Sequence, residues 1–231
     1  NSIVRFLIGQ GCKIIIVACN TASAAALHCL REDFPGLPFV GMEPAVKPAA
    51  ERTKTGVVGV LATPATFQGA LYTSVVERFA NGVQLLQDTC PGLVQQIEDG
   101  QLTHLVTEMI LRQALGPMLE QGIDTIVLGC THYPFVIPLI QEITGPNVRV
   151  IDPAPAVARQ TRRLLTEQNL LRKNPDYETD TGSENGLVRI LTTGDDQKLA
   201  GLLPPLMGEN WPVEPVYWFN QQEISETKPV N

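Results

Sequence analysis

Residues 13–21 have the sequence KIIIVACNT, and this stretch decides the fold. Its β-branched run predicts a short strand over Lys13–Ala18, buried on both faces as in a parallel sheet. Cys19 and two small polar residues end the strand, and the Ala-rich run Ala22–Leu30 predicts a helix. The segment therefore predicts a strand, a cysteine at its end and a helix, in that order.

A second segment repeats this order later in the chain. Residues 124–131 have the sequence DTIVLGCT, an apolar strand that ends close to Cys130 and is followed by small polar residues. The two cysteines are about 110 residues apart, roughly the length of one small domain. Ligands of open α/β sheets bind outside the carboxyl ends of the strands, so we expect both thiols at a ligand-binding edge.

Strands and helices alternate along the rest of the chain, which predicts an α/β fold with mainly parallel sheets. Further strands are predicted at Phe39–Met42, Thr55–Leu61, Val83–Leu86, Asp124–Leu128, Val148–Ile151 and Leu187–Thr192. Further helices are predicted at Pro44–Glu51, Thr66–Phe79, Leu93–Gln121 with a break near Gly116 and Pro117, Pro138–Ile143, Pro155–Gln168 and Gln197–Leu206. The polar stretch Lys173–Asn185 predicts a loop.

The composition excludes several classes of protein. Hydrophobic residues make up 44% of the 231 residues and charged residues 18%, which is typical of a folded globular protein rather than a disordered one. A formal net charge of -7 without a basic stripe argues against a nucleic-acid partner. Polar residues, Pro64 and glycines interrupt the uncharged stretch Thr55–Val76, so we expect no membrane span.

The five scattered cysteines do not have the pattern of a disulfide framework, which is dense and even in number. The chain has no CxxC or CxxH pair and its three histidines lie far apart, so we expect no metal site. We see no signal-peptide pattern, and we expect a reducing cytoplasm as the compartment.

Two thiols at strand ends suggest proton transfer. A cysteine at a helix start experiences the positive end of the helix dipole, which favours the thiolate and allows the thiol to act as a base near neutral pH. One thiol would remove a proton from a carbon while the other protonates the opposite face, an inversion that needs no cofactor. Asn20, Thr21 and Thr131 suit the carboxylate of an amino acid.

Each of these residues also has a structural interpretation. A cysteine is most often a small buried apolar residue, which is our interpretation of Cys12, Cys29 and Cys90. His132 lies two residues after Cys130 and is a candidate acid or base. Glu98 lies in Glu98-Asp99-Gly100, which is also the pattern of an ordinary solvated helix end.

Several motifs resemble those of the glutamate racemase family, in the aspartate/glutamate racemase group. They are Ala18-Cys19-Asn20-Thr21-Ala22, Gly129-Cys130-Thr131-His132-Tyr133-Pro134, Glu43-Pro44, Cys90-Pro91 leading to Glu98, Ile151-Asp152-Pro153-Ala154 and Thr192-Thr193-Gly194-Asp195. The first motif is shared across the group. The His-Tyr-Pro of the second is the specific part and indicates glutamate rather than aspartate or hydantoin.

The resemblance implies an isomerase that interconverts L- and D-glutamate and supplies D-glutamate for peptidoglycan, hence for cell-wall biogenesis and cell shape. Cys19 and Cys130 would be the two acid/base residues, Cys19 acting on D-glutamate and Cys130 on L-glutamate. Asn20, Thr21 and Thr131 would hold the substrate. His132 and Glu98 would assist Cys130, with His132 also at the substrate.

The resemblance also implies two pseudo-symmetric α/β domains with the active site at their interface. We place residues 41–151 in an inserted second domain, and residues 1–40 with 152–231 in the first. The family's initial Asp-Ser-Gly-Gly type loop and a later Tyr-Gly loop are absent, and the chain opens at Asn1. We therefore expect an amino-terminally truncated chain that alone racemises poorly or not at all.

Three questions stay open at this point. The substrate could be aspartate or another small amino acid, and the chain could be a catalytically silent amino-acid-binding fragment. A homodimer is possible. A pyridoxal enzyme is disfavoured because no lysine follows a strand end, and a redox role is disfavoured because the cysteine spacing gives no resolving motif.

Overall fold

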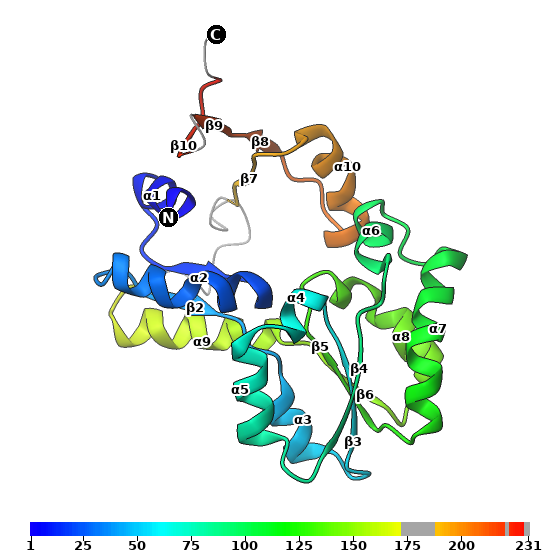
Figure 1. The fold of residues 1–231 in the computed structure, drawn as a ribbon. Helices are drawn as coiled ribbons and strands as arrows, with labels where there is room; N and C mark the ends of the chain where they lie inside the picture. Colours follow the sequence, from blue (N-terminus) through cyan, green and yellow to red (C-terminus); the bar gives the residue numbers. More distant parts are fainter. Residues whose placement is uncertain (172–187, 220–221, 229–231) are drawn as a thin grey trace, which may run out of the picture. The chain divides into compact units, whose positions relative to one another are not determined.

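The structure is a computed structural model that describes residues 1–171, 188–219 and 222–228 (Figure 1). Its chain contacts divide it into two compact units. The larger unit is residues 14–163, and the smaller unit is residues 1–13 together with 164–231. The domain limits expected from the sequence, and the site between domains, stay predictions.

The larger unit contains β1 (Ile15–Val17), α2 (Asn20–Asp33), β2 (Phe39–Gly41), α3 (Val46–Arg52), β3 (Val57–Leu61), α4 (Pro64–Phe67), α5 (Ala70–Phe79), β4 (Gln84–Asp88), α6 (Leu93–Glu98), α7 (Leu105–Glu120), β5 (Thr125–Leu128), η1 (Tyr133–Val136), α8 (Ile137–Thr144) and β6 (Arg149–Ile151). α9 (Ala154–Glu167) crosses the boundary between the two ranges. The smaller unit contains α1 (Ser2–Gly9), β7 (Ile190–Thr192), α10 (Asp196–Met207), β8 (Val213–Pro215), β9 (Tyr217–Phe219) and β10 (Glu223–Ser225).

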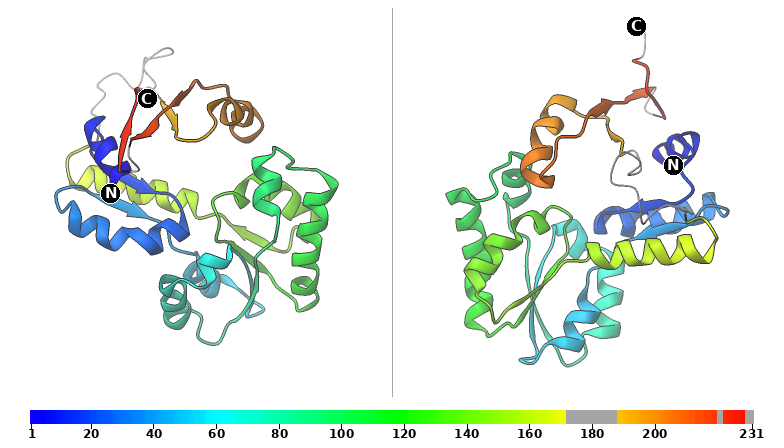
Figure 2. Two further views of the ribbon diagram at one scale, coloured as in Figure 1. Left: turned by 45° about the horizontal axis from the view of Figure 1, so that its top comes forward. Right: turned by 180° about the vertical axis from the view of Figure 1, so that it is seen from behind.

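A parallel sheet with the strand order β4-β3-β5-β6 forms the centre of the larger unit. α3 and α5 cover one face of the sheet and α7 and α8 cover the other (Figures 1 and 2). Every residue of β5 is buried, and Val58 and Val60 of β3 are fully inaccessible to solvent. Because both faces are covered, these strands are continuous apolar runs, and the predicted α/β fold with parallel sheets is confirmed.

β1 and β2 form a separate two-stranded parallel sheet beside α2. The Ser23 hydroxyl of α2 connects the two strand ends, because it donates to the Val17 carbonyl and accepts from the Met42 N–H, both at 2.9 Å. The sequence predicted that β1 is buried on both faces, and this prediction is wrong. Ile15 is buried, but Ile16 is 40% exposed. Among the described residues β1 pairs with β2 alone, so the sheet is too narrow to enclose it.

The predicted break near Gly116 and Pro117 is also wrong, because α7 runs through both residues. A proline removes one backbone donor, but the fully buried Leu111 and Leu115 hold the helix against the unit. The chain leaves the helical path earlier, between α6 and α7, where Gly100 has a positive φ of 71°. The single helix predicted over Thr66–Phe79 is likewise two helices, α4 and α5.

Hydrogen bonds of Arg189 connect several elements of the smaller unit. Its guanidinium pairs with Glu214 through two nitrogens at 3.0 and 2.5 Å, with Glu226 at 2.9 Å and with the Gln10 amide oxygen at 2.8 Å. β7 and β8 are parallel and β9 and β10 antiparallel. The predicted loop Lys173–Asn185 and the first residue, Leu187, of the strand predicted at Leu187–Thr192 lie outside the described residues, and the strand β7 begins at Ile190. None of the described helices combines the length and the apolar character that crossing a membrane requires.

Candidate active site

Cys19 lies at the junction of β1 and α2, as the sequence predicts. It is the N-cap residue of α2, with extended backbone angles of φ −147° and ψ 127°, and its thiol makes no capping hydrogen bond. Its carbonyl accepts the first helical hydrogen bond, from Ser23 N at 2.8 Å. The half-buried thiol therefore lies at the positive end of a 14-residue helix.

Cys130 lies just beyond the carboxyl end of β5 and is only 7% exposed. Gly129 comes before it, and its N–H donates to the Leu61 carbonyl at 2.7 Å. A Cβ at Gly129 would be 2.7 Å from the Cβ of Ala62, so only glycine allows this approach of β5 to β3. An α-helix does not follow at once: the single turn η1 comes first and then α8.

The expectation of a lowered thiol pKa is wrong for Cys130. Burial raises the pKa of this thiol, and backbone N–H groups of His132 and Tyr133 lower it without offsetting the burial. Negative charge on Cys19 and Glu98 raises the pKa further. The thiolate of Cys130 therefore needs a base nearby in order to form.

The structure brings the two thiols into one electrostatic environment, since charge on Cys19 acts on the pKa of Cys130. A direct hydrogen bond joins the segments next to them: the side-chain amide Nδ2 of Asn20 donates to the Gly129 backbone carbonyl at 2.8 Å. Asn20 follows Cys19 and Gly129 precedes Cys130. This bond thus holds the start of α2 beside the end of β5.

Asn20 is 3% exposed, and its amide oxygen has no hydrogen-bond partner in the part of the chain that the structure describes. A buried acceptor without a donor is unfavourable by about 1–3 kcal/mol. Such an atom is available to accept from an ammonium group or another donor of a ligand. The sequence predicted Asn20 as a substrate residue, and the structure places it between the two cysteine segments.

His132 lies between Cys130 and Glu98. Its Nδ1 is 3.7 Å from the Cys130 sulfur and its Nε2 is 3.0 Å from a Glu98 carboxylate oxygen. A carboxylate accepts hydrogen bonds and does not donate them, so the Glu98 contact favours the ring proton on Nε2. Nδ1 then has a free lone pair toward the thiol, which supplies the base that buried Cys130 needs.

Thr21 contacts two further threonines, Thr63 and Thr66, which the sequence motifs do not include. Its hydroxyl lies 3.3 Å from that of Thr63 and 3.2 Å from that of Thr66, and these two are 3.1 Å apart. Thr63 and Thr66 follow the carboxyl end of β3, so the strand-end rule could have found them. Thr131, the other predicted substrate residue, is half-buried next to Cys130.

The remaining cysteines differ from this pair. Cys29 is exposed, Cys12 is half-buried and Cys90 is buried. Burial raises the pKa of the Cys90 thiol, and the nearby Asp88 carboxylate and Cys130 raise it further, so Cys90 stays protonated. In the described part of the chain, no three His, Cys, Asp or Glu side chains gather as ligands of a metal ion.

Comparison with known proteins identifies the family. Residues 2–161 match the family model described as Asp/Glu/Hydantoin racemase. A glutamate racemase of Roseiflexus sp. (strain RS-1) is 48% identical over 198 residues, which cover 86% of this chain and 70% of the relative. A glutamate racemase of Stutzerimonas stutzeri (strain A1501) is 46% identical over 212 residues, covering 92% of this chain and 76% of the relative.

Solved structures show the same similarity. A glutamate racemase of Bacillus anthracis superposes with a TM-score of 0.78 at 29% identity, covering 93% of this chain and 77% of that one. The Escherichia coli glutamate racemase, in complex with L-glutamate and the activator UDP-MurNAc-ala, gives a TM-score of 0.75 at 30% identity over the same shares of the two chains. The chain therefore belongs to the Asp/Glu/Hydantoin racemase family, among its glutamate racemases.

Proposed function

We propose that this protein interconverts L- and D-glutamate, with Cys19 and Cys130 as its two acid/base residues. The observation that carries the proposal is the pairing of two strand-end thiols, whose segments are joined by the bond from the Asn20 side-chain amide to the Gly129 carbonyl. The relatives named glutamate racemase support glutamate as the substrate. The His132–Glu98 pair next to one of the thiols supports proton transfer as the chemistry.

In the direction from L- to D-glutamate, His132 Nδ1 takes the proton of the Cys130 thiol and leaves a thiolate. That thiolate removes the α-proton, and the electron pair of the C–H bond delocalises into the substrate carboxylate. The Cys19 thiol then gives its proton to the opposite face of the planar carbon. Cys130 ends as a thiol and Cys19 as a thiolate, while His132 still holds the proton that it took, and Cys19 is then ready to remove the α-proton of D-glutamate in the reverse direction.

The substrate's polar groups match the groups around the thiols. The unpartnered Asn20 oxygen accepts from the ammonium group. The hydroxyls of Thr21 and Thr131, with the N–H groups at the start of α2, donate to carboxylate oxygens and stabilise the negative charge that develops on the intermediate. The reaction needs no cofactor because the electrons of the broken C–H bond stay on the substrate.

Several further expectations accompany this activity. The D-glutamate formed would supply peptidoglycan synthesis in the cytoplasm. The absence of nucleic-acid and membrane partners, a homodimeric assembly, and weak activity of residues 1–231 alone stay predictions. Light scattering on the purified protein measures its oligomeric state.

The test is deuterium incorporation at the α-carbon from deuterated water, in the wild type and in Cys19→Ser and Cys130→Ser. A serine hydroxyl is a far weaker acid than a thiol, so racemisation falls by about 10²–10⁴-fold in each variant. The losses of exchange are one-sided: Cys130→Ser loses it from L-glutamate and Cys19→Ser from D-glutamate.

Cys29→Ser is the matched control, since Cys29 lies on the exposed part of α2, and its rates should equal those of the wild type. Exchange from both enantiomers that survives both substitutions would end the two-thiol proposal.

A parallel assay by circular dichroism with aspartate tests the substrate. Inversion of aspartate without inversion of glutamate would contradict the assignment to glutamate.

A further inference from the structure

The short helix α6 carries Glu98 as its last residue. Six residues are too few for a helix to be stable by its own hydrogen bonds, so its position depends on packing and on its ends. Leu93 and Ile97 are fully buried and fix one face of the helix. The ion pair itself provides little restraint, because the Glu98 side chain is 47% exposed and that of His132 is 33% exposed.

The end of α6 has a defined backbone cap. Gly100 adopts φ 71°, and its N–H donates to the Ile97 carbonyl at 2.9 Å. Gln101 N–H donates to the Gln96 carbonyl at 2.8 Å. These two bonds form a Schellman motif, which ends the helix directly after Glu98 and fixes the direction in which the chain leaves.

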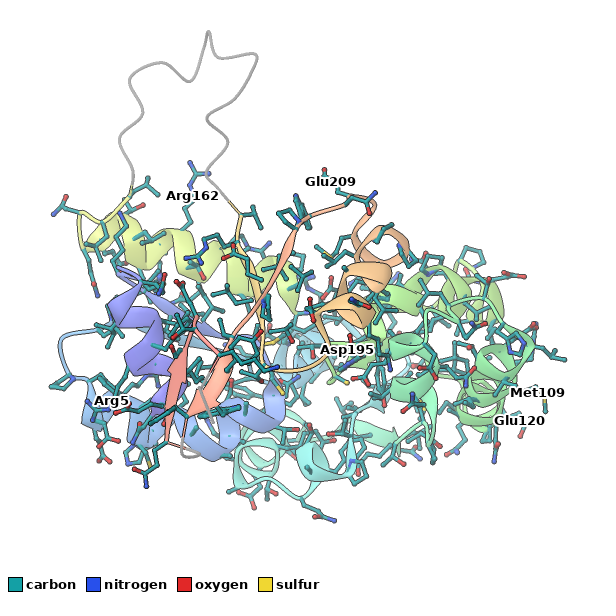
Figure 3. All side chains as sticks on the ribbon, turned by 90° about the horizontal axis from the view of Figure 1, so that it is seen from above. Arg5, Met109, Glu120, Arg162, Asp195 and Glu209 are labelled. Carbon is teal, nitrogen blue, oxygen red and sulfur yellow. The ribbon has the colours of Figure 1, made fainter. Side chains whose placement is uncertain are left out.

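A side chain from another helix holds this cap from outside. The Thr107 hydroxyl, in the first turn of α7, donates to the Gln101 carbonyl at 2.5 Å. Thr107 is fully buried, whereas Met109, two residues on, is 60% exposed and extends outward from α7 (Figure 3). Thr107 therefore connects the cap of α6 to the buried face of a 16-residue helix that packs on α8.

We propose that Thr107 is a positioning residue for catalysis, which acts by holding the α6 cap so that Glu98 reaches His132. The inference rests on the proposed function, because it presumes that Glu98 and His132 assist Cys130. Thr107 itself touches neither thiol. Thr107 acts on the reaction indirectly: its hydroxyl holds the backbone at Gln101 and Gly100, and this backbone fixes the position of Glu98.

This dependence distinguishes positioning from general support of the fold. If Thr107 acts through Glu98, its hydroxyl contributes nothing to the rate once the Glu98 carboxylate is gone. If it supports the fold at large, its loss lowers the rate by the same factor whether or not the carboxylate is present. A double-mutant cycle separates the two cases.

The experiment measures kcat and KM for glutamate in Thr107→Val, Glu98→Gln and the double variant of the intact gene product. Valine keeps the shape of threonine and removes the hydroxyl, and displacement of a catalytic group by about 1 Å can lower a rate by about 10²-fold. We expect kcat of Thr107→Val to fall about 10- to 100-fold, with KM unchanged. The double variant should have the kcat of Glu98→Gln alone.

Three further variants control the result. Thr107→Ser keeps the hydroxyl and should restore most of kcat, and Thr107→Ala removes it with less bulk, in case valine fits poorly. Thr144→Val removes a hydroxyl that donates to the Ile140 carbonyl at 2.9 Å in α8, away from the cap, and should leave kcat unchanged.

The outcomes separate the inference from the function on which it rests. A fall in Glu98→Gln without a fall in Thr107→Val or Thr107→Ala overturns the role of Thr107 alone. Losses that multiply in the double variant also overturn it, because Thr107 would then act independently of Glu98. An unchanged kcat in Glu98→Gln removes the assisting role of Glu98 and, with it, this inference.

Discussion

The two thiols follow similar sequences but lie in different environments. Cys19 follows a strand of a narrow sheet, is half-buried and is the N-cap residue of a long helix. Cys130 ends a strand of the four-stranded sheet, is 7% exposed and is followed by a single 3₁₀ turn. The His132–Glu98 pair lies beside Cys130.

The difference indicates that the local sequence motif determines where a thiol lies in the fold. The helices and strands packed around Cys130 determine its pKa. Burial raises the pKa of Cys130 more than the backbone N–H groups lower it. His132 Nδ1 lies 3.7 Å from the Cys130 sulfur, whereas Cys19 lies at the N-terminus of a long helix and has no such hydrogen-bond partner beside it among the described residues. The two thiols of the proposed pair therefore have unequal neighbours.

The largest effect is expected for His132→Asn. Asparagine can hydrogen-bond but cannot accept the thiol proton, so kcat should fall about 10²–10⁴-fold. The change should also be one-sided: alkylation by iodoacetamide, followed by mass spectrometry, should slow at Cys130 and not at Cys19. His28→Asn is the control, because the His28 side chain is 87% exposed on α2. Equal slowing of both cysteines would show that His132 does not serve Cys130 specifically.

A smaller effect is expected from adding one methyl group to a glycine in the neighbourhood of each sheet: Gly129, which precedes Cys130, and Gly41, which pairs with the end of β1. In Gly129→Ala the new Cβ meets the fixed Cβ of fully buried Ala62 at 2.7 Å, so we expect a loss of about 1–3 kcal/mol in the free energy of unfolding. In Gly41→Ala, in the sheet of Cys19, the nearest atom is Cδ2 of Leu27, the end of a flexible side chain, and the loss should be smaller.

Urea unfolding of both variants measures this contrast as the shift of the midpoint at constant slope. The Gly129→Ala variant also disturbs the carbonyl that accepts from Asn20, so its kcat should fall with its stability. Equal losses in the two variants would mean that both sheets are equally rigid around their thiols.

The strands and both thiols could be predicted because their signals are local. The buried strands β3 and β5 are apolar runs, and Cys19 and Cys130 follow strand ends directly. The same rule applied to β3 would have indicated Thr63 and Thr66. Gly100 signals the end of α6, whereas Pro117 does not end α7, because the packing of buried Leu111 and Leu115 holds that helix.

Other features have no local signal. The exposure of Ile16 depends on how many strands flank β1, and the raised pKa of Cys130 depends on the layers around β5. The bond between Asn20 and Gly129 joins residues 109 positions apart. The contact of Thr107 with Gln101 requires the turn between two helices, which the sequence predicted as one helix.

The smallest expected effect is on the pH dependence of stability. A neutral hydroxyl connects the strands of one sheet, whereas a carboxylate connects β5 of the other sheet to a loop. Ser23 connects β1 and β2, and Asp124, just before β5, accepts from the Thr53 hydroxyl at 2.7 Å and from the N–H groups of Lys54 and Thr55 at 2.5 and 3.1 Å. Burial alone would raise the pKa of Asp124, but these bonds outweigh it and the pKa is lowered.

A carboxyl group whose pKa is lowered by folding stabilises the protein fully above its ordinary range and loses that contribution as the pH falls through the lowered value. Asp124→Asn should therefore reduce the free energy of unfolding by about 1 kcal/mol at neutral pH, and the gap to the wild type should close as the pH falls below about 4. Ser23→Ala should give a gap of about 1 kcal/mol that does not change with pH, because a hydroxyl does not titrate. Urea midpoints at both pH values measure the two gaps. A gap for Asp124→Asn that persists in acid would show that the shape of this side chain, rather than its charge, holds β5 to the preceding loop.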